Sequence, residues 1–373
     1  MKQEHKISEV WPATPVKVVI TAGHAATTAY SLIEKLREKH PNWDLYWIGS
    51  KHAIEGKNVT TLEHKIFSTL GVAYHTINSG RLQRKLTIWT IPSFFKIPIG
   101  FFQAFWELVS IKPNVIISFG GHTSFPVVVA GYILGIPSVL HEQTAAAGLA
   151  NKICAPLAKV VAISRPSSVK YFPKNKTVLV GNLISKEILS VGKKVKKSSP
   201  STIYITGGSR GSQVINKAVE EVLPNLVKNF KVYHQTGDLD FNHFNSLKSD
   251  RYFPLDSLTP FEVMEIYKKS DIVVSRAGAN TVSEIMAIGR PSVLIPIPWV
   301  QNDEQNKNAE FAVESGIAVL LPEVDLNKEN LLSRISYLEA NWEKMVKTYK
   351  SEFSELDKKA SSKLVSLVED ILG

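Results

Sequence analysis

Residues 275–291, SRAGANTVSEIMAIGRP, place a strand end, a turn of small residues and the start of a helix next to one another. The preceding run, residues 271–275 (DIVVS), predicts a buried parallel strand, and residues 281–288 show helical periodicity that ends at a Gly-Arg-Pro sequence. Small residues in such a turn let backbone N–H groups approach a ligand, and the N-terminus of a helix favours an anion. Glu284, one turn into the helix, can accept hydrogen bonds from sugar hydroxyls beside that anion. The alternative is a tight connection with a solvated glutamate.

The same order of features recurs three times elsewhere in the chain. Residues 202–206 (TIYIT) form a strand-like run before the turn Gly207-Gly208-Ser209-Arg210-Gly211 and a helix-periodic segment. In the first half, one strand-like run leads into Ala22-Gly23-His24 and another leads into Gly120-Gly121-His122. Open α/β sheets bind ligands at such turns, beyond the carboxyl ends of their strands. We therefore expect ligand contacts from both halves of the chain.

Strand-like runs alternate with helical patterns through most of the sequence, which is the rhythm of parallel βαβ units. A stretch rich in Gly, Lys, Ser and Pro, ILSVGKKVKKSSPS, interrupts this rhythm before it restarts at Thr202. We therefore predict an α/β fold with a first domain at residues 1–188, a linker at 189–201 and a second domain at 202–340. Residues 341–373 are predicted to form an amphipathic helix that packs across the domain junction.

Composition and charge narrow the class of protein. The chain has 373 residues, 44% of them hydrophobic and 21% charged, which is enough for two cores. Its single cysteine, Cys154, is predicted to be a free buried thiol in a reducing compartment, and the N-terminus lacks the apolar core of a secretory signal. A formal net charge of +10 indicates an anionic partner. Nucleic acid is disfavoured because no zinc-finger spacing, RNA-binding aromatic signature or long basic run is present, which leaves anionic lipid and phosphorylated substrates.

One aromatic stretch does not fit a simple α/β domain. Residues 88–106, IWTIPSFFKIPIGFFQAFW, are long enough to raise the question of a membrane span, but two prolines, a glycine and polar residues interrupt them. A segment lying in the membrane interface fits better, with a helix hairpin buried in the first domain as the alternative. Nearby basic residues at 81, 84 and 85 would contact headgroups. The predicted membrane-facing residues are Trp89, Phe94, Phe95, Lys96, Phe101, Phe102 and Trp106.

Eight segments stand in a specific order along the chain. They are GGHTSFP (120–126), LGIPSVLHEQ (134–143), GLANK (148–152), VGN (180–182), GGSRGSQVIN (207–216), HQTG (234–237), SRAGANTVSEIMAIGRP (275–291) and QNKNA (305–309). Their combination is specific, whereas each segment alone is weak. Together they resemble the MurG family, glycosyltransferases that transfer N-acetylglucosamine from UDP-N-acetylglucosamine to a lipid-linked peptidoglycan precursor.

The resemblance implies a GT-B fold, in which two Rossmann-like domains face each other across a cleft and the donor lies mostly on the C-terminal side. The implied reaction is inverting transfer of N-acetylglucosamine to undecaprenyl-pyrophosphoryl-N-acetylmuramyl-pentapeptide in peptidoglycan synthesis. The implied partners are UDP-N-acetylglucosamine, a polyprenyl-pyrophosphate-linked glycan and an anionic membrane surface, with the protein peripheral on the cytoplasmic face of the cell membrane. The resemblance implies no required cofactor, and it leaves open whether a divalent cation binds loosely.

Site residues follow from the resemblance position by position, with Glu284 on the ribose hydroxyls and Gln305 on the sugar hydroxyls. The implied donor-binding residues are Thr21, Ala22, Gly23, Asn182, Gly207, Gly208, Ser209, Arg210, Gly211, Gly278, Ala279, Asn280, Thr281, Val282, Ser283, Glu284, Gln305 and Asn308. The implied acceptor-binding residues are Gly120, Gly121, His122, Thr123, Ser124, His141, Glu142, Gln143 and Thr144.

The sequence departs from the family pattern mainly on the acceptor side. The family's first loop usually reads GGTGGH and is soon followed by proline, whereas this chain reads TAGHAATTA. Thr144 stands where the family has asparagine after HEQ, and GNLISKE lacks the arginine that usually follows GNP. A glycosyltransferase acting on a different membrane lipid is therefore one alternative. A UDP-N-acetylglucosamine epimerase and a binding protein that has lost catalysis are two others.

Inverting transfer needs a base for the attacking hydroxyl and a stabiliser for the departing diphosphate. His24 is the best candidate for the base, since it keeps the family position and histidine titrates near neutral pH. His122, His141 and Glu142 are expected to fix the acceptor loop instead. Helix dipoles with Arg210 or Lys186 are the expected stabilisers, and the D-x-D sequence Asp238-Leu239-Asp240 is not expected to hold a metal ion.

Overall fold

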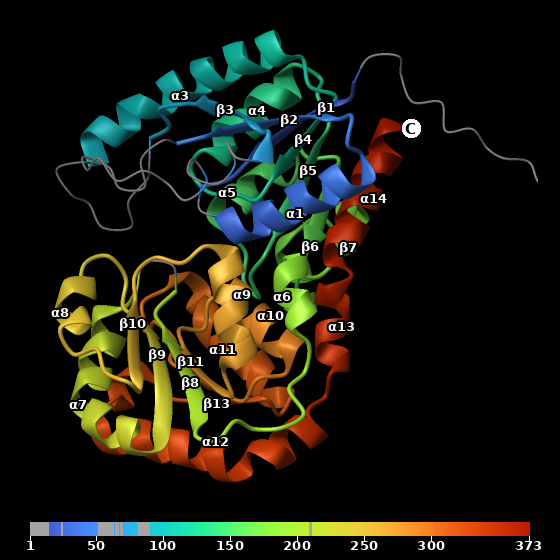
Figure 1. The fold of residues 1–373 in the computed structure, drawn as a ribbon. Helices are drawn as coiled ribbons and strands as arrows, with labels where there is room; N and C mark the ends of the chain where they lie inside the picture. Colours follow the sequence, from blue (N-terminus) through green and yellow to red (C-terminus); the bar gives the residue numbers. More distant parts are fainter. Residues whose placement is uncertain are drawn as a thin grey trace, which may run out of the picture.

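The computed structural model describes residues 15–23, 25–50, 63, 67, 70–80, 90–208 and 211–373, with only the backbone described at residues 90–95 and 301. It contains two parallel β-sheets, each flanked by helices, which form an N-terminal and a C-terminal lobe (Figure 1). The N-terminal sheet has the order β3-β2-β1-β4-β5-β6-β7 and the C-terminal sheet the order β10-β9-β8-β11-β12-β13. This arrangement is the α/β, GT-B-like fold that the sequence predicts.

The strands follow the predicted rhythm closely. Those of the N-terminal lobe are β1 (Lys17–Thr21), β2 (Asp44–Gly49), β3 (Ala73–Thr76), β4 (Val115–Ser118), β5 (Ser138–Glu142), β6 (Val160–Ile163) and β7 (Thr177–Leu179). Those of the C-terminal lobe are β8 (Ser201–Thr206), β9 (Phe230–Gln235), β10 (Tyr252–Leu255), β11 (Ile272–Ser275), β12 (Ser292–Leu294) and β13 (Ala318–Leu320).

Helices connect these strands and cover the faces of both sheets. In the N-terminal half they are α1 (Ala26–Lys39), α3 (Thr90–Ile111), α4 (Ser124–Ile133), α5 (Leu149–Cys154) and α6 (Lys186–Val191). Later in the chain come α7 (Gln213–Asn229), α8 (Phe241–Asn245), α9 (Pro260–Lys269), α10 (Ala279–Ile288), α11 (Glu304–Glu314), α12 (Lys328–Thr348), α13 (Glu352–Lys358) and α14 (Ala360–Leu372). Cys154 at the end of α5 is buried and free, as predicted.

The central strands are buried on both faces because helices cover each side of the sheet. In β1, Val18 and Ile20 pack into one hydrophobic cluster with α1, whereas Val19 packs into another cluster with α3 and α4. Every residue of β8 and of β11 is buried. A parallel sheet covered on both faces needs near-continuous apolar strands, which explains why these runs are readable from the sequence.

Both sheets reverse their strand order beside the first strand of each lobe. Strand β1 pairs with β2 on one side and β4 on the other, and β8 pairs in the same way with β9 and β11. Loops that leave neighbouring strands at such a point diverge to opposite faces and open a crevice. The turns after β1, β4, β8 and β11, which the sequence singles out, therefore all lie at the switch points.

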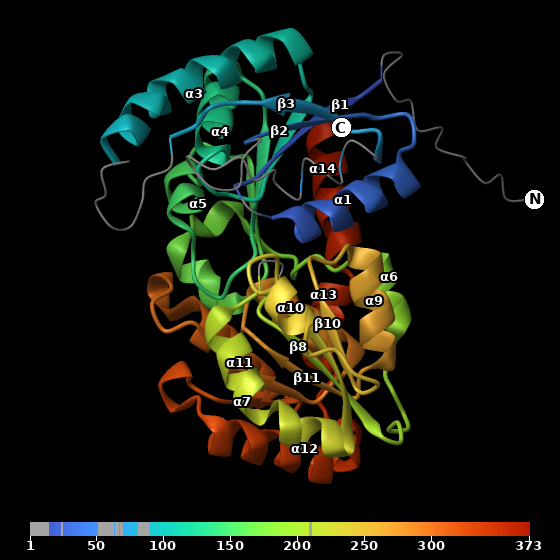
Figure 2. The same ribbon diagram turned by 60° about the vertical axis from the view of Figure 1, so that its left-hand side comes forward.

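The end of the chain crosses from the C-terminal lobe back to the N-terminal lobe (Figures 1 and 2). Helix α12 packs against α7, α13 packs against α10, and α14 packs against α1. The charged contact between α1 and α14 includes the Lys39 Nζ to Glu369 Oε2 pair at 2.6 Å. The segment predicted as one helix from residue 341 is thus the end of α12 followed by two further helices.

The lysine-rich segment between the lobes is held in place by ion pairs. Lys194 Nζ lies 2.8 Å from the buried Asp271 Oδ1, and Lys197 Nζ lies 2.6 Å from Glu339 Oε1. Just before this segment, α6 packs against α9 and α10, so Ile188 belongs to the hydrophobic cluster of the C-terminal lobe. The chain therefore joins the C-terminal lobe before β8 begins.

The aromatic stretch forms a single helix, α3, rather than a buried hairpin. Ile99, Phe102 and Trp106 are exposed on one face, with Phe102 61% and Trp106 66% exposed, whereas Ala104 and Leu108 are buried on the other. Among the described residues, no helix is long and apolar enough to cross a membrane.

The helical phase of α3 corrects one of the predicted membrane-facing residues. Phe101 lies partly against the hydrophobic cluster of the N-terminal lobe, together with Phe105, because it falls on the same side of the helix as Ala104 and Leu108. Lys96 is half-buried. Trp89 and the side chains of Phe94 and Phe95 lie outside the described residues.

Candidate active site

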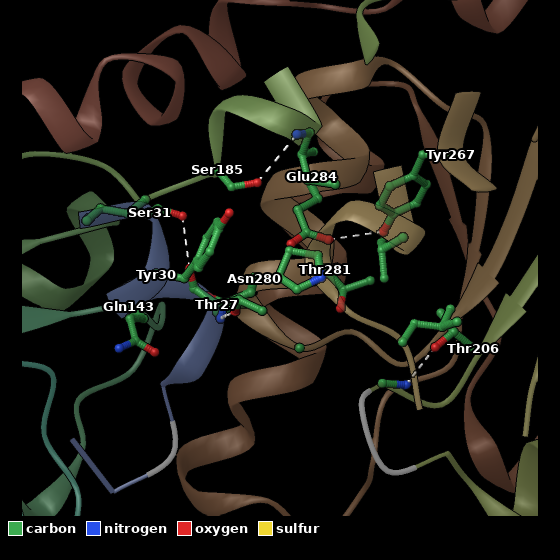
Figure 3. A pocket seen from close by; sticks show the side chains of 18 of the residues that line it. Thr27, Tyr30, Ser31, Gln143, Ser185, Thr206, Tyr267, Asn280, Thr281 and Glu284 are labelled. Carbon is green, nitrogen blue, oxygen red and sulfur yellow. Dashed lines mark hydrogen bonds between the residues drawn. The ribbon is translucent and has the colours of Figure 1, made fainter. Parts of the chain in front are cut away.

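A pocket of about 310 Å³ lies between the two lobes (Figure 3). The N-terminal lobe contributes Thr27, Tyr30 and Ser31 of α1 and the pair Gln143 and Thr144 after β5. The C-terminal lobe contributes the ends of β8 and β9, the N-terminal turn of α10 and one face of α9. Its lining residues include Tyr204, Thr206, Gly208, Gln235, Tyr267, Gly278, Ala279, Asn280, Thr281, Glu284 and Glu304.

Glu284 is the acidic group at the centre of this lining. The Tyr267 hydroxyl donates to Glu284 Oε2 at 3.2 Å, and in Figure 3 the second carboxylate oxygen lies on the side toward Tyr30. Burial raises the pKa of Glu284 to about 7, although the hydrogen bond from Tyr267 opposes this shift. The glutamate lines the pocket, so the alternative of a solvated surface residue does not hold. One of its oxygens stays available to accept from a ligand.

The turn after β8 is folded so tightly that only glycine fits at two positions. A Cβ added to Gly207 would lie 2.3 Å from Gly211 C and Ser212 N, and one added to Gly211 would lie 2.0 Å from Thr236 O. The Thr206 hydroxyl accepts from Gly208 N at 3.0 Å and donates to Gln235 Oε1 at 2.7 Å. Gly208 itself lines the pocket. Ser209 and Arg210 lie outside the described residues.

The N-terminal turn of α10 opens onto the pocket without a side-chain cap. Gly278 is the N-cap residue, and a Cβ built on it would meet nothing within 4 Å. The first N–H groups of a helix have no partner within the helix, so this turn offers donors and a positive dipole end to an anion. The same turn carries Ala279 and Thr281 into the lining.

Arg276, which the sequence does not single out, ties the two turns together. Its Nε and Nη2 donate to Ser212 Oγ at 3.2 and 2.9 Å, and Ser212 is the N-cap of α7. The guanidinium is buried and also donates to Ile295 O. Arg276 lies within residues 275–291, which indicated a place near the site. The sequence could not show that its side chain points away from the pocket.

Two predicted donor residues on α10 point away from the pocket. Val282 packs into the hydrophobic cluster of the C-terminal lobe, and Ser283 is fully buried at the junction of the lobes. Ser283 Oγ accepts from Arg165 Nη2 at 2.7 Å and from Asn182 Nδ2 at 3.1 Å. A helix turns by about 100° per residue, so a continuous motif cannot place every side chain on one face.

Asn280 connects the lobes beside the pocket. Its Nδ2 donates to Thr27 Oγ1 at 2.7 Å, while its Oδ1 accepts from Thr28 Oγ1 at 3.1 Å and from Asn182 Nδ2 at 3.0 Å. The nearby Arg165 and Asp357 form a buried bidentate pair at 2.7 and 2.8 Å. The structure therefore places Asn182 in a bridge between lobes, within reach of the α10 turn.

Gln305 and Asn308 support the backbone around the pocket. Gln305 Oε1 accepts from Ile297 N at 3.0 Å, and Asn308 Nδ2 donates to Ala277 O at 3.1 Å. The neighbouring Glu304 lines the pocket instead. No sequence pattern indicates this one-residue difference, which depends on the phase of α11.

The turns after β1 and β4 pack directly on one another. Gly23 N donates to Gly120 O at 2.8 Å, and the Thr123 hydroxyl donates to Ala22 O at 2.6 Å. Ser124 Oγ donates to Gly120 O, and Ser79 Oγ donates to His122 O. Thr21 is buried at the end of β1. His24, the proposed base, lies outside the described residues.

Glu142 and His141 use polar atoms in hydrogen bonds within the N-terminal lobe, around the loop that follows β5. Glu142 accepts from Thr144 N, Thr144 Oγ1, Gly148 N and Asn151 Nδ2 at 2.8–3.1 Å. His141 is buried with Nε2 2.9 Å from Gly181 O, and burial lowers its pKa to about 4. Through these contacts, Glu142 and His141 stabilise the loop that places Gln143 and Thr144 in the pocket.

The D-x-D sequence at residues 238–240 and Lys186, which were both considered for the diphosphate, are not in the pocket lining. Asp240 Oδ2 accepts from Asn216 Nδ2 at 2.7 Å, and no three His, Cys, Asp or Glu side chains in the described part of the chain gather closely enough to hold a metal ion. Lys186 Nζ lies 3.2 Å from Glu34 Oε1 at the edge of α1.

A pocket between two parallel-sheet lobes, with an open helix N-terminus and a carboxylate in its lining, is the arrangement expected of a GT-B glycosyltransferase. The chain matches the model of the glycosyltransferase family 28 N-terminal domain over residues 19–163 and that of the C-terminal domain over residues 202–365. It belongs to this family and, within it, to the MurG family.

Individual relatives agree with this assignment. A UDP-N-acetylglucosamine–N-acetylmuramyl-(pentapeptide) pyrophosphoryl-undecaprenol N-acetylglucosamine transferase from Lachnoclostridium phytofermentans is 33% identical, covering 94% of this chain and 96% of the relative. The crystal structure of Acinetobacter baumannii MurG has a TM-score of 0.70 at 23% identity, covering 95% and 100% of the two chains. A UDP-GlcNAc 2-epimerase from Neisseria meningitidis has a TM-score of 0.63 at 14% identity, covering 95% and 100%, so the fold alone is shared with it.

Proposed function

We propose that this glycosyltransferase moves N-acetylglucosamine from UDP-N-acetylglucosamine to undecaprenyl-pyrophosphoryl-N-acetylmuramyl-pentapeptide, with inversion at the sugar. The observation that carries the proposal is the pocket between the lobes, in which Gly208, the α10 N-terminus and Glu284 line one wall. The L. phytofermentans relative, which is named for this reaction, supports the choice of substrates because the similarity extends over 94% of the chain.

The donor half of the proposal assigns one part of the pocket to each part of UDP. The diphosphate would lie at the uncapped N-terminus of α10 and the Gly208 turn, where backbone N–H groups and the helix dipole favour negative charge. The ribose would lie one helical turn further on, where Glu284 can accept from its hydroxyls. Departure of UDP is then helped by donors already in position, which lowers the cost of the developing charge.

The acceptor half assigns the base to His24. In this step the His24 imidazole takes the proton of the acceptor hydroxyl, the new glycosidic bond forms, and the bond from the sugar to UDP breaks. The tight contact between Gly23 and Gly120 supports this role, because it brings the segment next to His24 against the turn after β4. The acceptor pyrophosphate would approach the turn at residues 120–124.

We further propose that the protein is peripheral on the cytoplasmic face of the cell membrane. A polyprenyl acceptor stays in the bilayer, so the lobe that receives it must reach the headgroups. The exposed face of α3, formed by Ile99, Phe102 and Trp106, supports this orientation.

The test is to incubate the protein with UDP-N-acetylglucosamine and the lipid-linked muramyl-pentapeptide, followed by mass spectrometry of the lipid. Gain of one N-acetylhexosamine on the acceptor with release of UDP is expected. Transfer only to another membrane lipid would replace the proposed acceptor. Formation of UDP-N-acetylmannosamine, or of UDP and free N-acetylmannosamine, with no lipid product would favour an epimerase.

A further inference from the structure

Tyr30 reaches into the pocket from the N-terminal lobe. It stands on α1, one turn beyond Thr27, and in Figure 3 its ring lies across from Tyr267 with Glu284 between the two. No part of the family motifs includes it. Its ring is half-buried, and its hydroxyl donates to Glu187 Oε1 on α6 at 3.5 Å.

The contacts of α1 fix which end of the pocket Tyr30 occupies. Thr27 accepts from Asn280 at the N-terminal turn of α10, so the beginning of α1 lies at the end proposed for the diphosphate. Tyr30 is one turn further along and reaches Glu187, the residue next to the pocket-lining Ile188. The ring therefore lies on the α6 side of the pocket, beside the Glu284 carboxylate.

That end of the pocket is apolar. Leu183, Ile188, Leu258 and Val263 line the pocket and all belong to α6, α9 or the segments that lead into them, which pack against one another. A flat nucleobase is the part of a UDP-sugar that gains from apolar and aromatic neighbours, and aromatic side chains stack on any base because every base has a π-face.

We propose that Tyr30 is a donor-contacting residue that packs against the nucleoside half of the UDP-sugar, so that both lobes hold the donor, and that Glu34 and Glu187 position its ring. The inference rests on the proposed function, because it takes UDP as the ligand. It adds a contact from α1 to a donor site otherwise built by the C-terminal lobe.

The two glutamates form a bridge between the lobes behind Tyr30. Glu34 stands on α1 and its side chain is 9% exposed, while Glu187 stands on α6. Glu34 Oε1 pairs with Lys186 Nζ at 3.2 Å, the Oε2 atom of each glutamate is buried, and the two carboxyl groups are within hydrogen-bond reach of each other. Two carboxyl groups at close range share one proton, since two charges there would repel.

The electrostatics of the bridge agree with a shared proton. Burial and the neighbouring Glu187 raise the pKa of Glu34 to about 7, while Lys186 opposes the shift. Burial and the two glutamates also raise the pKa of Tyr30, so its hydroxyl stays protonated and serves as a donor. Glu38 is a further charge that faces Lys186. Together these contacts restrict the ring of Tyr30 to the α6 side of the pocket.

Calorimetry with UDP and with inorganic diphosphate on the full-length protein tests the contact. Tyr30→Ala should weaken UDP binding about tenfold, the scale of a lost base–aromatic stack, and leave diphosphate binding unchanged. Tyr30→Phe, which keeps the ring, should lose about threefold or less. Tyr337→Ala, which removes an exposed tyrosine from α12, is the matched control and should bind UDP like the wild type.

The outcomes separate the inference from the proposed function. Failure of the wild-type protein to bind UDP would refute the proposed function itself. Wild-type binding with unchanged affinity in Tyr30→Ala, or an equal loss for UDP and diphosphate, would overturn the contact. If Tyr30→Ala does not fold, Tyr30→Leu replaces it with the same expectation, since leucine keeps apolar volume but has no flat face to stack.

The positioning role is tested by a conservative rescue. Glu187→Gln can still donate to Glu34 and accept from Tyr30, so it should keep UDP affinity within about twofold. Glu187→Ala should raise KM for the UDP-sugar about fivefold with kcat nearly unchanged, because the contact acts in binding. Equal effects of Gln and Ala, or a fall in kcat alone, would show that the pair does not position Tyr30.

Discussion

The turn that begins α10 and the turn that follows β4 are built from the same kinds of residue but serve opposite purposes. A Cβ added to Gly278 would meet nothing within 4 Å, so this glycine leaves space in front of a helix N-terminus. A Cβ added to Gly121 would lie 2.6 Å from Gly23 Cα, and one added to Gly23 would lie 2.9 Å from Gly121 Cα. One turn is open to a ligand, and the other is closed on its neighbour.

The difference shows what a small-residue turn at a strand end can mean. At Gly278 the missing side chain leaves the backbone donors of α10 accessible to a ligand. At Gly23 and Gly121 the missing side chains let two loops pack together, and Gly23 N donates to Gly120 O. The same sequence pattern thus predicts either a ligand contact or a contact between loops, and only packing decides between them.

Alanine substitution of the two glycines should separate these uses most clearly. Gly121 has φ near +93°, so Gly121→Ala adds backbone strain to a direct overlap with Gly23 and should lower the free energy of unfolding by about 3 kcal/mol or more. Gly278→Ala, at an ordinary negative φ, should lower it by about 1 kcal/mol or less. Urea unfolding followed by circular dichroism measures both.

Ligand binding should show the reverse order. A methyl group at position 278 projects toward the space in front of the helix, so Gly278→Ala should weaken UDP binding although the fold persists. If Gly121→Ala proves as stable as the wild type, the two loops are not closed on each other and the comparison fails.

Two glutamates extend the comparison to side chains. Among the described residues, Glu142 accepts four hydrogen bonds from the loop after β5 and from α5, whereas Glu284 accepts one, from Tyr267. Glu142→Ala leaves partly buried donors such as Gly148 N unpaired, so the free energy of unfolding should fall by about 2 kcal/mol. Differential scanning calorimetry of this variant should show a lower Tm, and an unchanged Tm would mean that water satisfies these donors.

Glu284→Ala should act on binding instead. Hydrogen bonds to a charged group contribute about 1.5–3 kcal/mol, so UDP affinity should fall about tenfold or more while the fold is kept. Isothermal titration calorimetry gives the dissociation constant. An unchanged dissociation constant for Glu284→Ala would remove this residue from the donor site.

The sequence predicts the strands and the four turns well because buried parallel strands leave continuous apolar runs. It could predict Gly208 and Glu284 as pocket residues, since Gly208 lies in the turn after β8 and Glu284 lies one turn into the helix that follows β11. It could not predict that Val282 and Ser283 face away, or that Glu304 rather than Gln305 lines the pocket. Those outcomes depend on the phase of α10 and α11 relative to the cleft, and small errors in phase move a side chain to another face.

Gln143 and Thr144, which were predicted as site residues, do line the pocket from the N-terminal lobe, but the pocket residues on α1 were beyond sequence reasoning. Thr27 and Tyr30 lie about 250 positions from Asn280 and Glu284, and no local pattern joins them. Likewise, Arg165 and Asp357 meet only because the last helices cross back over the junction. Contacts of this kind follow from how the two lobes sit together, which periodicity and propensity do not encode.

The two faces of α3 give a third form of the comparison. Phe102 and Trp106 are exposed, whereas Phe101 and Phe105 pack partly on the core. Changing Phe102 and Trp106 to Ser should reduce cosedimentation with anionic liposomes about tenfold. Each substitution removes an apolar ring, and burial of apolar surface in the membrane contributes about 25 cal/mol of binding free energy per Å². Changing Phe101 and Phe105 to Ser should mainly lower the Tm. Equal liposome binding by the first variant and the wild type would place the membrane contact elsewhere.

The smallest expected effect is a dependence of donor affinity on pH through Glu284. Its folded pKa of about 7 lies above the ordinary value of 4.5, so the free protein holds the proton more tightly than the unfolded chain. The stability that Glu284 contributes is therefore present below about pH 4.5 and is lost as the pH rises through 7. Ribose hydroxyls donate best to the ionised form, so donor binding should release a proton.

Affinity for UDP-N-acetylglucosamine should accordingly rise with pH, by at most about fivefold between pH 6 and 7. The UDP-sugar is the right ligand for this measurement, because its diphosphate diester does not titrate in this range, unlike the terminal phosphate of UDP. Glu284→Gln stays neutral and should bind with an affinity that varies little over the same interval. A rise of the same size in Glu284→Gln would assign the pH dependence to another group. Glu284 would then be ionised over this whole interval, in a pocket more polar than its burial indicates.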